Sequence, residues 1–181
     1  FPDEVKKSAE RAHALLMQRG ADPRGRVDLR HRLIMAIDPA TAHDHDDAVS
    51  IDALPGGRWR LGVHIADVAA YVEPGSAIDR EALRRGNSTY LVDRVIRMLP
   101  RDLTVQVCSL LPGEDHLAHT AEIIYDSHGS VLETKTFRSI IRSRATLSYE
   151  QVQDYFDSGQ LPGAADDVRE ALRHLRGLAR K

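Results

Sequence analysis

An acidic loop between two expected strands reads Ile37-Asp38-Pro39-Ala40-Thr41-Ala42-His43-Asp44-His45-Asp46-Asp47-Ala48-Val49. The apolar residues 33–37 before it are typical of a buried strand, and a second strand begins at Val49. Four carboxylates in so short a loop repel one another, which raises their pKa values and destabilises the compact state. A divalent cation removes that cost, and oxygen ligands without sulfur suit Mg²⁺ or Mn²⁺. The pattern therefore predicts a metal site between the two strands.

The four aspartates occupy different positions in the expected backbone. Asp44 and Asp46 lie two residues apart, so their side chains point the same way if the segment is extended. Asp47 then points elsewhere, and Asp38 approaches from the end of the preceding strand. Asp44 and Asp46 are therefore expected to converge, with Asp38 beside them.

Two other interpretations of the acidic loop stay open. The first is a solvated acidic loop, since short runs of aspartate are common. The second is a calcium loop, but the EF-hand template fails because the fifth and sixth positions from Asp44 are Ala48 and Val49. His43 and His45 are further candidate ligands, although a histidine beside a carboxylate is more often its hydrogen-bond partner.

Charge is distributed unevenly along the chain, although the net charge is only −2. Residues 38–52 carry five aspartates and no lysine or arginine, whereas residues 80–101 carry six arginines against two acidic residues. Residues 133–144 carry a further net charge of +3. An acidic centre flanked by basic segments suits a metal site that acts on a polyanion, but solvated strand and helix faces produce the same pattern.

The bulk composition indicates one folded domain. The chain has 181 residues, of which 42% are hydrophobic and 29% charged, as is usual for globular proteins. Its one cysteine, Cys108, excludes an internal disulfide, and we expect a cytoplasmic location. No apolar run approaches the roughly 20 residues that span a bilayer, so no membrane partner is expected.

Strands that come in hairpins and helices that come in groups favour an α+β fold, with a mixed, largely antiparallel sheet and flanking helices. Helices are expected at residues 2–19, 79–86, 149–156 and 164–181, the third opened by a capping box at Ser148-x-x-Gln151. Strands are expected at 33–37, from 49 onward, and at 59–65, 117–125 and 131–144. Pro55-Gly56-Gly57 and Asp126-Ser127-His128-Gly129 are the expected hairpin turns.

Further motifs follow the acidic loop in order along nearly the whole chain. They include Leu61-Gly62-Val63-His64-Ile65-Ala66-Asp67-Val68, Arg85-Gly86-Asn87-Ser88-Thr89-Tyr90-Leu91, Met98-Leu99-Pro100, Cys108-Ser109-Leu110 and Leu147-Ser148-Tyr149. Together with the four aspartates, these motifs resemble the ribonuclease II / ribonuclease R family, the RNB-type exoribonucleases. The resemblance implies that residues 31–181 are the N-terminal half of an RNB catalytic domain. Residues 1–30 are then an N-terminal helix and a linker that leads into it.

The resemblance implies metal-dependent, processive 3′→5′ hydrolysis of single-stranded RNA to nucleoside 5′-monophosphates. Carried over by position, Asp38, Asp44, Asp46 and Asp47 are the family's acidic metal centre, with Mg²⁺ or Mn²⁺ as the cofactor. Asp38 and Asp47 are the implied direct ligands, and Asp46 is the residue most essential for the chemistry. A metal-bound water is a nucleophile at neutral pH, and a second ion stabilises the leaving oxygen.

Three residues are implied RNA contacts. Tyr90 matches the family tyrosine that stacks on a base near the scissile end, Tyr149 matches a position near the ribose, and Arg85 is placed to contact phosphate. The residues alone leave other roles open: a buried core tyrosine for Tyr90, helix capping or packing for Tyr149, and an ordinary surface arginine for Arg85. The same ambiguity holds for the arginines at positions 138, 142 and 144. A structural role is expected for Asp67, and a core position for Cys108.

The chain departs from the family pattern in two segments. The family usually places proline where Val92 and Arg97 stand, and a Ser-Asn or Ser-Asp pair where Thr104-Val105 stands. The family domain is also about twice as long, and its later half supplies an arginine, a glutamate and a second stacking aromatic. We therefore expect a longer chain with cold-shock and S1-type RNA-binding modules. The alternative is an RNA-binding fragment or pseudoenzyme without the second half of the active site.

Overall fold

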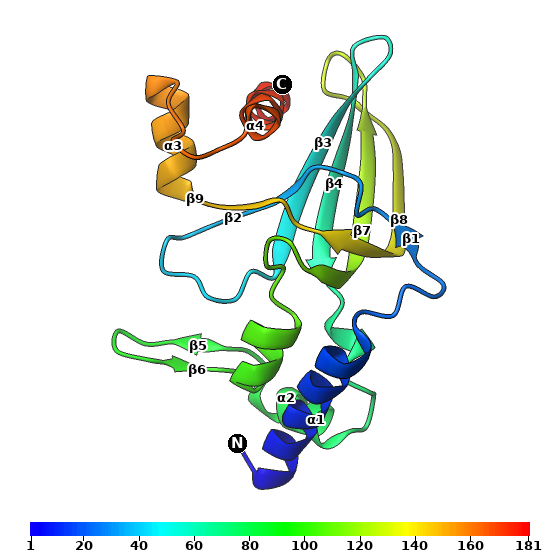
Figure 1. Cartoon of the computed structure of the whole chain (residues 1–181), viewed down its shortest axis with the longest axis vertical. Coiled ribbons are helices and arrows are strands. Elements are labelled where there is room, and N and C mark those ends of the chain that lie inside the picture. The colour runs from blue at the N-terminus through cyan, green and yellow to red at the C-terminus, as the bar shows by residue number, and fades with distance from the viewer.

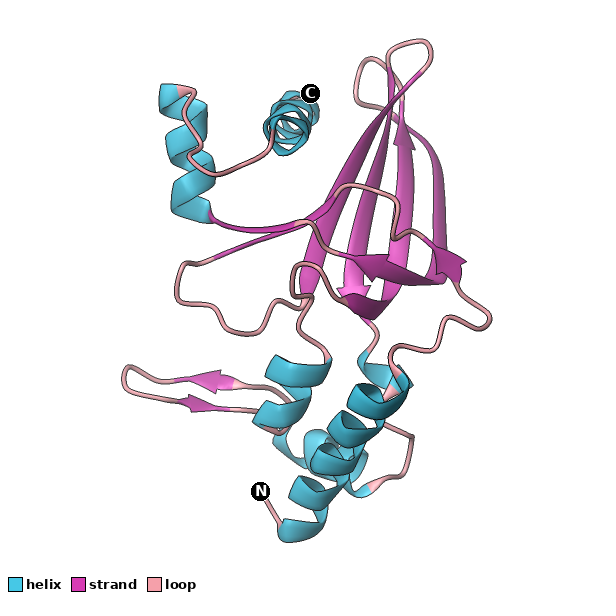
Figure 2. Cartoon of the chain, in the orientation of Figure 1, coloured by secondary structure: helices cyan, strands magenta, loops and turns pink.

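The computed structural model describes residues 1–181, apart from the side chain of Arg19. Its helices are α1 (Asp3–Arg19), η1 (Val68–Ala70), α2 (Ala77–Arg85), η2 (Asp102–Val107), α3 (Tyr149–Ser158) and α4 (Asp166–Ala179). Its strands are β1 (Val27–Asp28), β2 (Ile34–Asp38), β3 (Asp47–Leu54), β4 (Arg58–Ala66), β5 (Thr89–Tyr90), β6 (Val95–Ile96), β7 (Asp115–Tyr125), β8 (Val131–Arg142) and β9 (Ala145–Ser148). Figure 1 shows their arrangement, and Figure 2 separates the helices from the strands.

Seven strands form one sheet in the order β1-β8-β7-β4-β3-β2-β9. The inner pairings from β8 to β2 run antiparallel through successive neighbours, whereas β1 and β9 join the two edges in parallel. The two expected hairpins are confirmed: β3–β4 turns through Gly56 and Gly57, both with positive φ, and β7–β8 turns at Asp126. The α+β prediction, with a largely antiparallel sheet and flanking helices, is confirmed.

Alternating side chains of β2 divide the core into two clusters. Ile34 and Ala36 belong to one cluster, which α1 and η2 help to form, and Met35 belongs to another, which α3 and α4 complete. Successive side chains of a strand point to opposite faces of a sheet, so a continuously apolar strand buries both faces. The helices accordingly fall into two groups: α1 and α2 below the sheet, and α3 and α4 beside it (Figure 1). The acidic loop leaves the C-terminal end of this doubly buried strand.

Several elements differ from the expected boundaries. The helix expected at 79–86 is α2, which begins two residues earlier because Ser76 caps it by accepting a hydrogen bond from the Asp79 amide. The strand expected at 131–144 is β8, which ends at Arg142. Strand β9 follows at Ala145–Ser148 and was not expected; it lies at one edge of the sheet, whereas β8 lies next to the other edge. The chain crosses between them at Ser143, whose buried hydroxyl donates to the Ala145 carbonyl over 3.1 Å. The capping box at Ser148 and Gln151 is confirmed.

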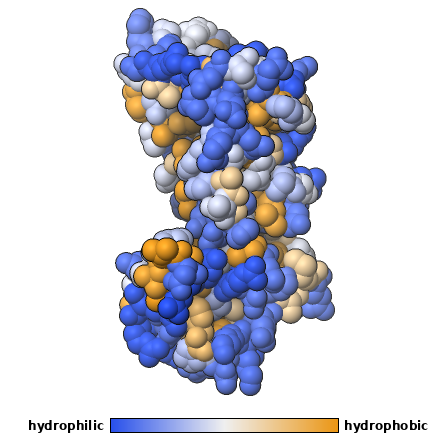
Figure 3. Space-filling model, turned by 90° about the vertical axis from the view of Figure 1, so that its left-hand side faces the viewer, coloured by the Kyte–Doolittle hydropathy of each residue, from blue (hydrophilic) through white to orange (hydrophobic). Residues whose placement is uncertain are grey.

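Several short elements were not predicted from the sequence, among them the β5–β6 hairpin and η2. The β5–β6 hairpin projects from the lower half of the molecule (Figure 1), and η2 is a six-residue π-helix that runs directly into Cys108. Much of the hairpin is apolar yet exposed, and Figure 3 shows an apolar patch at its level. Its exposed apolar residues are Tyr90, Leu91, Val92, Val95 and Ile96. Within the described part of the chain, no helix combines the length and apolar character that a membrane span requires.

Candidate metal centre

The acidic loop connects two neighbouring antiparallel strands, so Asp38 at the end of β2 and Asp47 at the start of β3 lie at the same end of the sheet. Tertiary hydrogen bonds hold the loop between them. The His45 amide donates to the Ser109 hydroxyl over 3.0 Å, and the His45 carbonyl accepts from the Leu110 amide over 2.9 Å. The Asp46 carbonyl accepts from the Ala66 amide over 2.9 Å. The loop is therefore pinned to the segment after η2 and to the end of β4.

The crowding of negative charge expected from the sequence is present. Partial desolvation, followed by the charges of Asp44, Asp47 and Asp38, raises the pKa of the Asp46 carboxyl. Partial desolvation, followed by the charge of Asp38, also raises the pKa of Asp47. Both residues remain exposed at the surface, so the protein removes only part of the water around them. A divalent cation among these carboxylates would relieve the repulsion that, after desolvation, contributes to these pKa shifts.

The other two carboxylates of the loop have partners of their own. Asp44 forms an ion pair with Arg97, with 2.6 Å between Oδ2 and Nη1, and Asp38 is hydrogen-bonded to Nδ1 of His45 over 2.7 Å. The expectation that a histidine of this loop is a hydrogen-bond partner of a carboxylate thus agrees with the position of His45. Among the described residues, no group of three or more His, Cys, Asp or Glu side chains is gathered so that it could hold a metal ion. The carboxylate donor set suits a hard divalent cation, but two of its members are turned toward other side chains.

Arg97 reaches the acidic loop from the end of the β5–β6 hairpin and is held there by α2. Nη1 of Arg85 donates to the Arg97 carbonyl over 3.1 Å, and Nε of Arg85 donates to Oε1 of buried Glu81 over 2.8 Å. The Arg85 guanidinium also lies 3.8 Å from the ring centroid of Phe1, a cation–π contact. Arg85, a predicted phosphate contact, is thus largely engaged within the protein. Its role toward RNA stays a prediction.

The two predicted RNA-contacting tyrosines both lie at the surface. Tyr90 on β5 is 71% exposed, which excludes the alternative of a buried core tyrosine. Tyr149 is 55% exposed and opens α3, while the capping contacts there are made by Ser148 and Gln151. Ser148 pairs with Asp38 across β9 and β2, so Tyr149 follows directly on the residue beside the acidic loop. Both rings are accessible for stacking.

Other residues singled out in the sequence have structural partners. Asp67 forms a buried ion pair with Arg26, in agreement with its expected structural role, and Cys108 is buried in the core as expected. Burial raises the pKa of the Cys108 thiol to about 12, so the group stays protonated. Arg142 pairs with Asp115 over 2.7 Å. Arg144 lies 3.9 Å from Asp167.

Sequence reasoning missed Arg97 and Ser109 as residues that touch the acidic loop. The sequence marked Arg97 only as a departure from the family pattern, and that departure gave no indication that its side chain contacts Asp44. Ser109 lies within one of the family-like motifs, but nothing in the motif shows that its hydroxyl accepts from the His45 amide.

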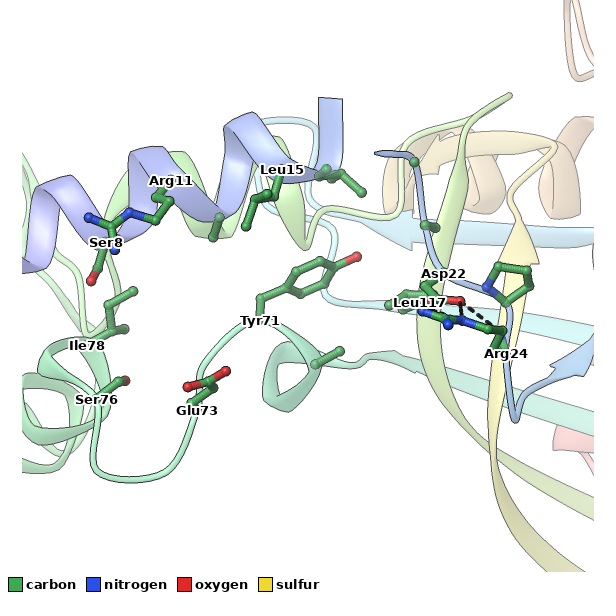
Figure 4. Close-up of a pocket in the computed structure, with 16 residues that line it drawn as sticks. Ser8, Arg11, Leu15, Asp22, Arg24, Tyr71, Glu73, Ser76, Ile78 and Leu117 are labelled. Carbon is green, nitrogen blue, oxygen red and sulfur yellow. Dashed lines mark hydrogen bonds and ion pairs between the residues drawn. The ribbon is translucent and has the colours of Figure 1, made fainter. Parts of the chain in front are cut away.

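A cavity of about 700 Å³ lies elsewhere, between α1 and the chain around Tyr71. Figure 4 shows Arg11 and Leu15 of α1 across from Tyr71 and Glu73, with Asp22 and Arg24 at one end. The acidic loop and the two exposed tyrosines do not line it. The carboxylates of the candidate site and this cavity therefore lie apart among the described residues.

A comparison with family models decides the classification. The model described as the RNB domain matches residues 26–181, which is most of the chain. The chain belongs to the RNB family. The RNB match begins at Arg26, the residue directly before β1, and it includes the acidic loop, the β5–β6 hairpin and both exposed tyrosines.

Similar proteins extend this result. Ribonuclease R of Thermotoga maritima is 43% identical over 157 residues, which cover 87% of the RNB chain and 22% of that relative. The structure of Mycoplasma genitalium RNase R in complex with ribose methylated single-stranded RNA matches 99% of the chain and 28% of its own length, with a TM-score of 0.90 and 30% identity. A protein named inactive exonuclease DIS3L2, from Arabidopsis thaliana, is 48% identical over 132 residues, 73% of the chain and 12% of its own length. The RNB chain thus spans less than a third of each of these relatives.

Proposed function

We propose that the chain is part of the catalytic domain of an exoribonuclease that hydrolyses single-stranded RNA processively from the 3′ end to nucleoside 5′-monophosphates. The single observation that carries the proposal is the acidic loop within an RNB match: four carboxylates, two with raised pKa values, at one end of the sheet. Membership of the RNB family and the likeness to ribonuclease R support an exonucleolytic reaction on RNA.

In this proposal Asp38, Asp44, Asp46 and Asp47 hold Mg²⁺ or Mn²⁺. A cation held by these carboxylates would supply a water of lowered pKa, able to act as a nucleophile toward the phosphodiester at neutral pH. Asp46 is the proposed catalytic residue, because its carboxyl feels the charge of all three other aspartates and so gains most from a cation.

The protein's own groups position the RNA around this centre. Tyr90 presents an accessible ring for stacking on a base, which favours single strands and tolerates any base. Tyr149 presents a hydroxyl beside the strand end that carries Asp38, where it can sense a ribose 2′-OH. Arg85 is proposed to contact the RNA phosphates, and it adds to the positive charge of the arginine-rich segment 80–101.

The test replaces Asp46 with Asn in the complete protein and follows shortening of a 5′-labelled single-stranded RNA, and release of mononucleotides from a uniformly labelled one, with Mg²⁺ or Mn²⁺. We expect cleavage to be abolished while the dissociation constant for RNA changes little, since Asn keeps the shape but not the charge. Asp154→Asn, on the exposed face of α3, is the matched control and should cleave normally. Undiminished cleavage by the Asp46→Asn protein rejects the proposal, as does internal cleavage in place of 3′ trimming.

A second function, RNA binding without cleavage, has two supporting observations. Asp44 and Asp38 are engaged with Arg97 and His45, and one similar protein is named an inactive exonuclease. In this case the wild-type protein binds RNA with a steep dependence on salt, but neither Mg²⁺ nor Mn²⁺ produces mononucleotides. The wild-type arm of the same assay therefore separates the two functions.

The remaining proposals concern partners and location. We propose that the protein acts with cold-shock and S1-type RNA-binding modules and works in the cytoplasm, where the one buried thiol stays reduced. Single-stranded RNA is the proposed substrate and partner, in keeping with the ribose methylated single-stranded RNA in the complex with Mycoplasma genitalium RNase R.

A further inference from the structure

We propose that Arg97 is an exchangeable counter-ion of Asp44, and that it weakens the affinity of the acidic loop for divalent cations. The inference rests on the proposed function, because it assumes that this loop is the metal site. It identifies a residue outside the acidic loop that sets the concentration of Mg²⁺ or Mn²⁺ at which the site is occupied.

The contact itself is close and partly enclosed. Nη1 of Arg97 lies 2.6 Å from Oδ2 of Asp44, and the exposed fractions of the two side chains are 20% and 21%. A charge-assisted hydrogen bond of this kind is stronger than a neutral one, and partial enclosure reduces its screening by solvent. A divalent cation that takes Asp44 must therefore displace the guanidinium or approach it against repulsion.

The charge of the site changes accordingly. Four ionised aspartates carry −4, and the paired guanidinium reduces that to −3. Arginine cannot lose its proton in a protein, so the reduction persists at every pH at which the protein is folded. The protein thus supplies a permanent positive charge at the place where the metal is proposed to bind.

The anchoring of Arg97 leaves its guanidinium able to exchange. Its carbonyl is held by Arg85, and the next residue, Met98, donates its amide to the Ser88 hydroxyl over 2.9 Å. These contacts fix the backbone at Arg97 and directly after it. The guanidinium sits on a flexible stem beyond them, so it can leave Asp44 while the hairpin keeps its place.

Arg94 provides a matched control. It lies on the same hairpin, is 70% exposed and pairs over 3.5 Å with its neighbour Asp93 rather than with the acidic loop. Arg94→Met removes the same charge from the same segment as Arg97→Met. A difference between the two variants therefore reports the contact with Asp44 and not the net charge of the protein.

The experiment titrates Mn²⁺ into the complete protein by isothermal calorimetry, with the manganese-induced rise in melting temperature as a second readout. We expect Arg97→Met to bind Mn²⁺ about tenfold more tightly than Arg94→Met, since a like charge no longer opposes the cation. Arg97→Gln, which keeps a hydrogen-bond donor without the charge, should show the same gain and serves if the Met variant unfolds. Affinity equal to or weaker than that of Arg94→Met in both Arg97 variants overturns the inference.

The wild-type titration separates this inference from the proposed function. If wild type binds Mn²⁺ and the Arg97 variants bind it no more tightly, the metal site stands and the counter-ion role is rejected. If wild type and all variants take up no Mn²⁺, the metal centre is rejected together with the inference.

Discussion

Arg26 and Asp67 form an ion pair that is almost completely enclosed. Nη2 of Arg26 lies 2.7 Å from Oδ2 of Asp67, and the two side chains are only 8% and 7% exposed. The same guanidinium donates from Nη1 to the carbonyls of Ala118 and Ser139, both over 3.3 Å. The linker before β1 is therefore fastened at once to β7, to β8 and to the turn that begins η1.

Replacing Arg26 with Met should destabilise the protein strongly, because Asp67 is left as a buried charge without its partner. Loss of one member of a buried pair typically costs about 3–5 kcal/mol. Urea unfolding measures the change as a lower midpoint. The exposed pair Arg24–Asp22 provides the control, and Arg24→Met should leave the midpoint unchanged. Equal midpoints for the two variants would show that the buried pair contributes no more than the surface one.

His64 makes stability depend on pH. Its ring is fully buried between the Ser50 hydroxyl at 3.0 Å from Nε2 and the Thr120 hydroxyl at 2.9 Å from Nδ1. Burial, followed by the charge of Arg32, lowers the pKa of His64 from 6.5 to about 4. The unfolded chain thus binds a proton at a higher pH than the folded protein does.

The contribution of His64 to the free energy of unfolding is fully present above about pH 6.5 and is lost as the pH falls toward 4. The loss is at most about 3 kcal/mol. Free energies of unfolding at pH 7 and pH 4.5 measure the loss. His64→Gln should reduce the difference between the two pH values, since Gln keeps polar atoms but does not titrate in this range. The same pH dependence in both proteins would assign the effect to other groups.

Gly62 lies against the same buried histidine. A Cβ at this position would clash with the Ser50 hydroxyl and would lie only 2.8 Å from Nε2 of His64. Gly62→Ala should therefore cost about 1–3 kcal/mol, as overpacked cores do. Gly177→Ala in α4 is the control, because a Cβ there meets nothing within 4 Å and alanine favours a helix. Calorimetric melting should show opposite shifts, and a rise in melting temperature for Gly62→Ala would contradict the proposed packing.

Tyr90 should contribute to RNA affinity through its ring and not its hydroxyl. Tyr90→Ala is expected to weaken binding of single-stranded RNA by about 1–3 kcal/mol, roughly five- to 150-fold, whereas Tyr90→Phe should bind as wild type does. Fluorescence anisotropy with a labelled oligonucleotide measures both. The control is Leu83→Ala, which removes an exposed apolar side chain on α2, away from the hairpin strand that carries Tyr90. A similar loss in the Phe and Ala variants would assign the contact to the hydroxyl.

Local signals in the sequence were enough to predict most of the sheet and the capped helix. The glycine turn at Gly56–Gly57, the Asp126 turn and the Ser148–Gln151 capping box each depend on residues within a few positions of one another. Tertiary contacts decided the rest. Strand β9 pairs with β2 over a hundred residues away in sequence, and β5 and β6 contain only two residues each, too few for a periodic pattern.

The candidate site shows the same division. Crowding of the four aspartates was predictable, since repulsion depends only on their spacing, and the pKa directions of Asp46 and Asp47 agree with it. The partners of Asp44 and the loop backbone were not predictable. Arg97 and Ser109 lie more than fifty residues further along the chain, and only the fold brings them to the loop.

The shortness of β1 has a consequence for how molecules of this protein meet one another. Strand β1 covers β8 only at Ser139 and Ile140, so the outer part of β8 is an open edge on which a strand of a second molecule could dock. Along that edge lie Glu133, Lys135 and Arg138. The regular pairing of β7 with β8 is interrupted at Ile124/Tyr125, beside the Val131 end of β8. Charge and irregular backbone together oppose fibril-like stacking at high concentration, and charge-removing substitutions on β8 would weaken that protection.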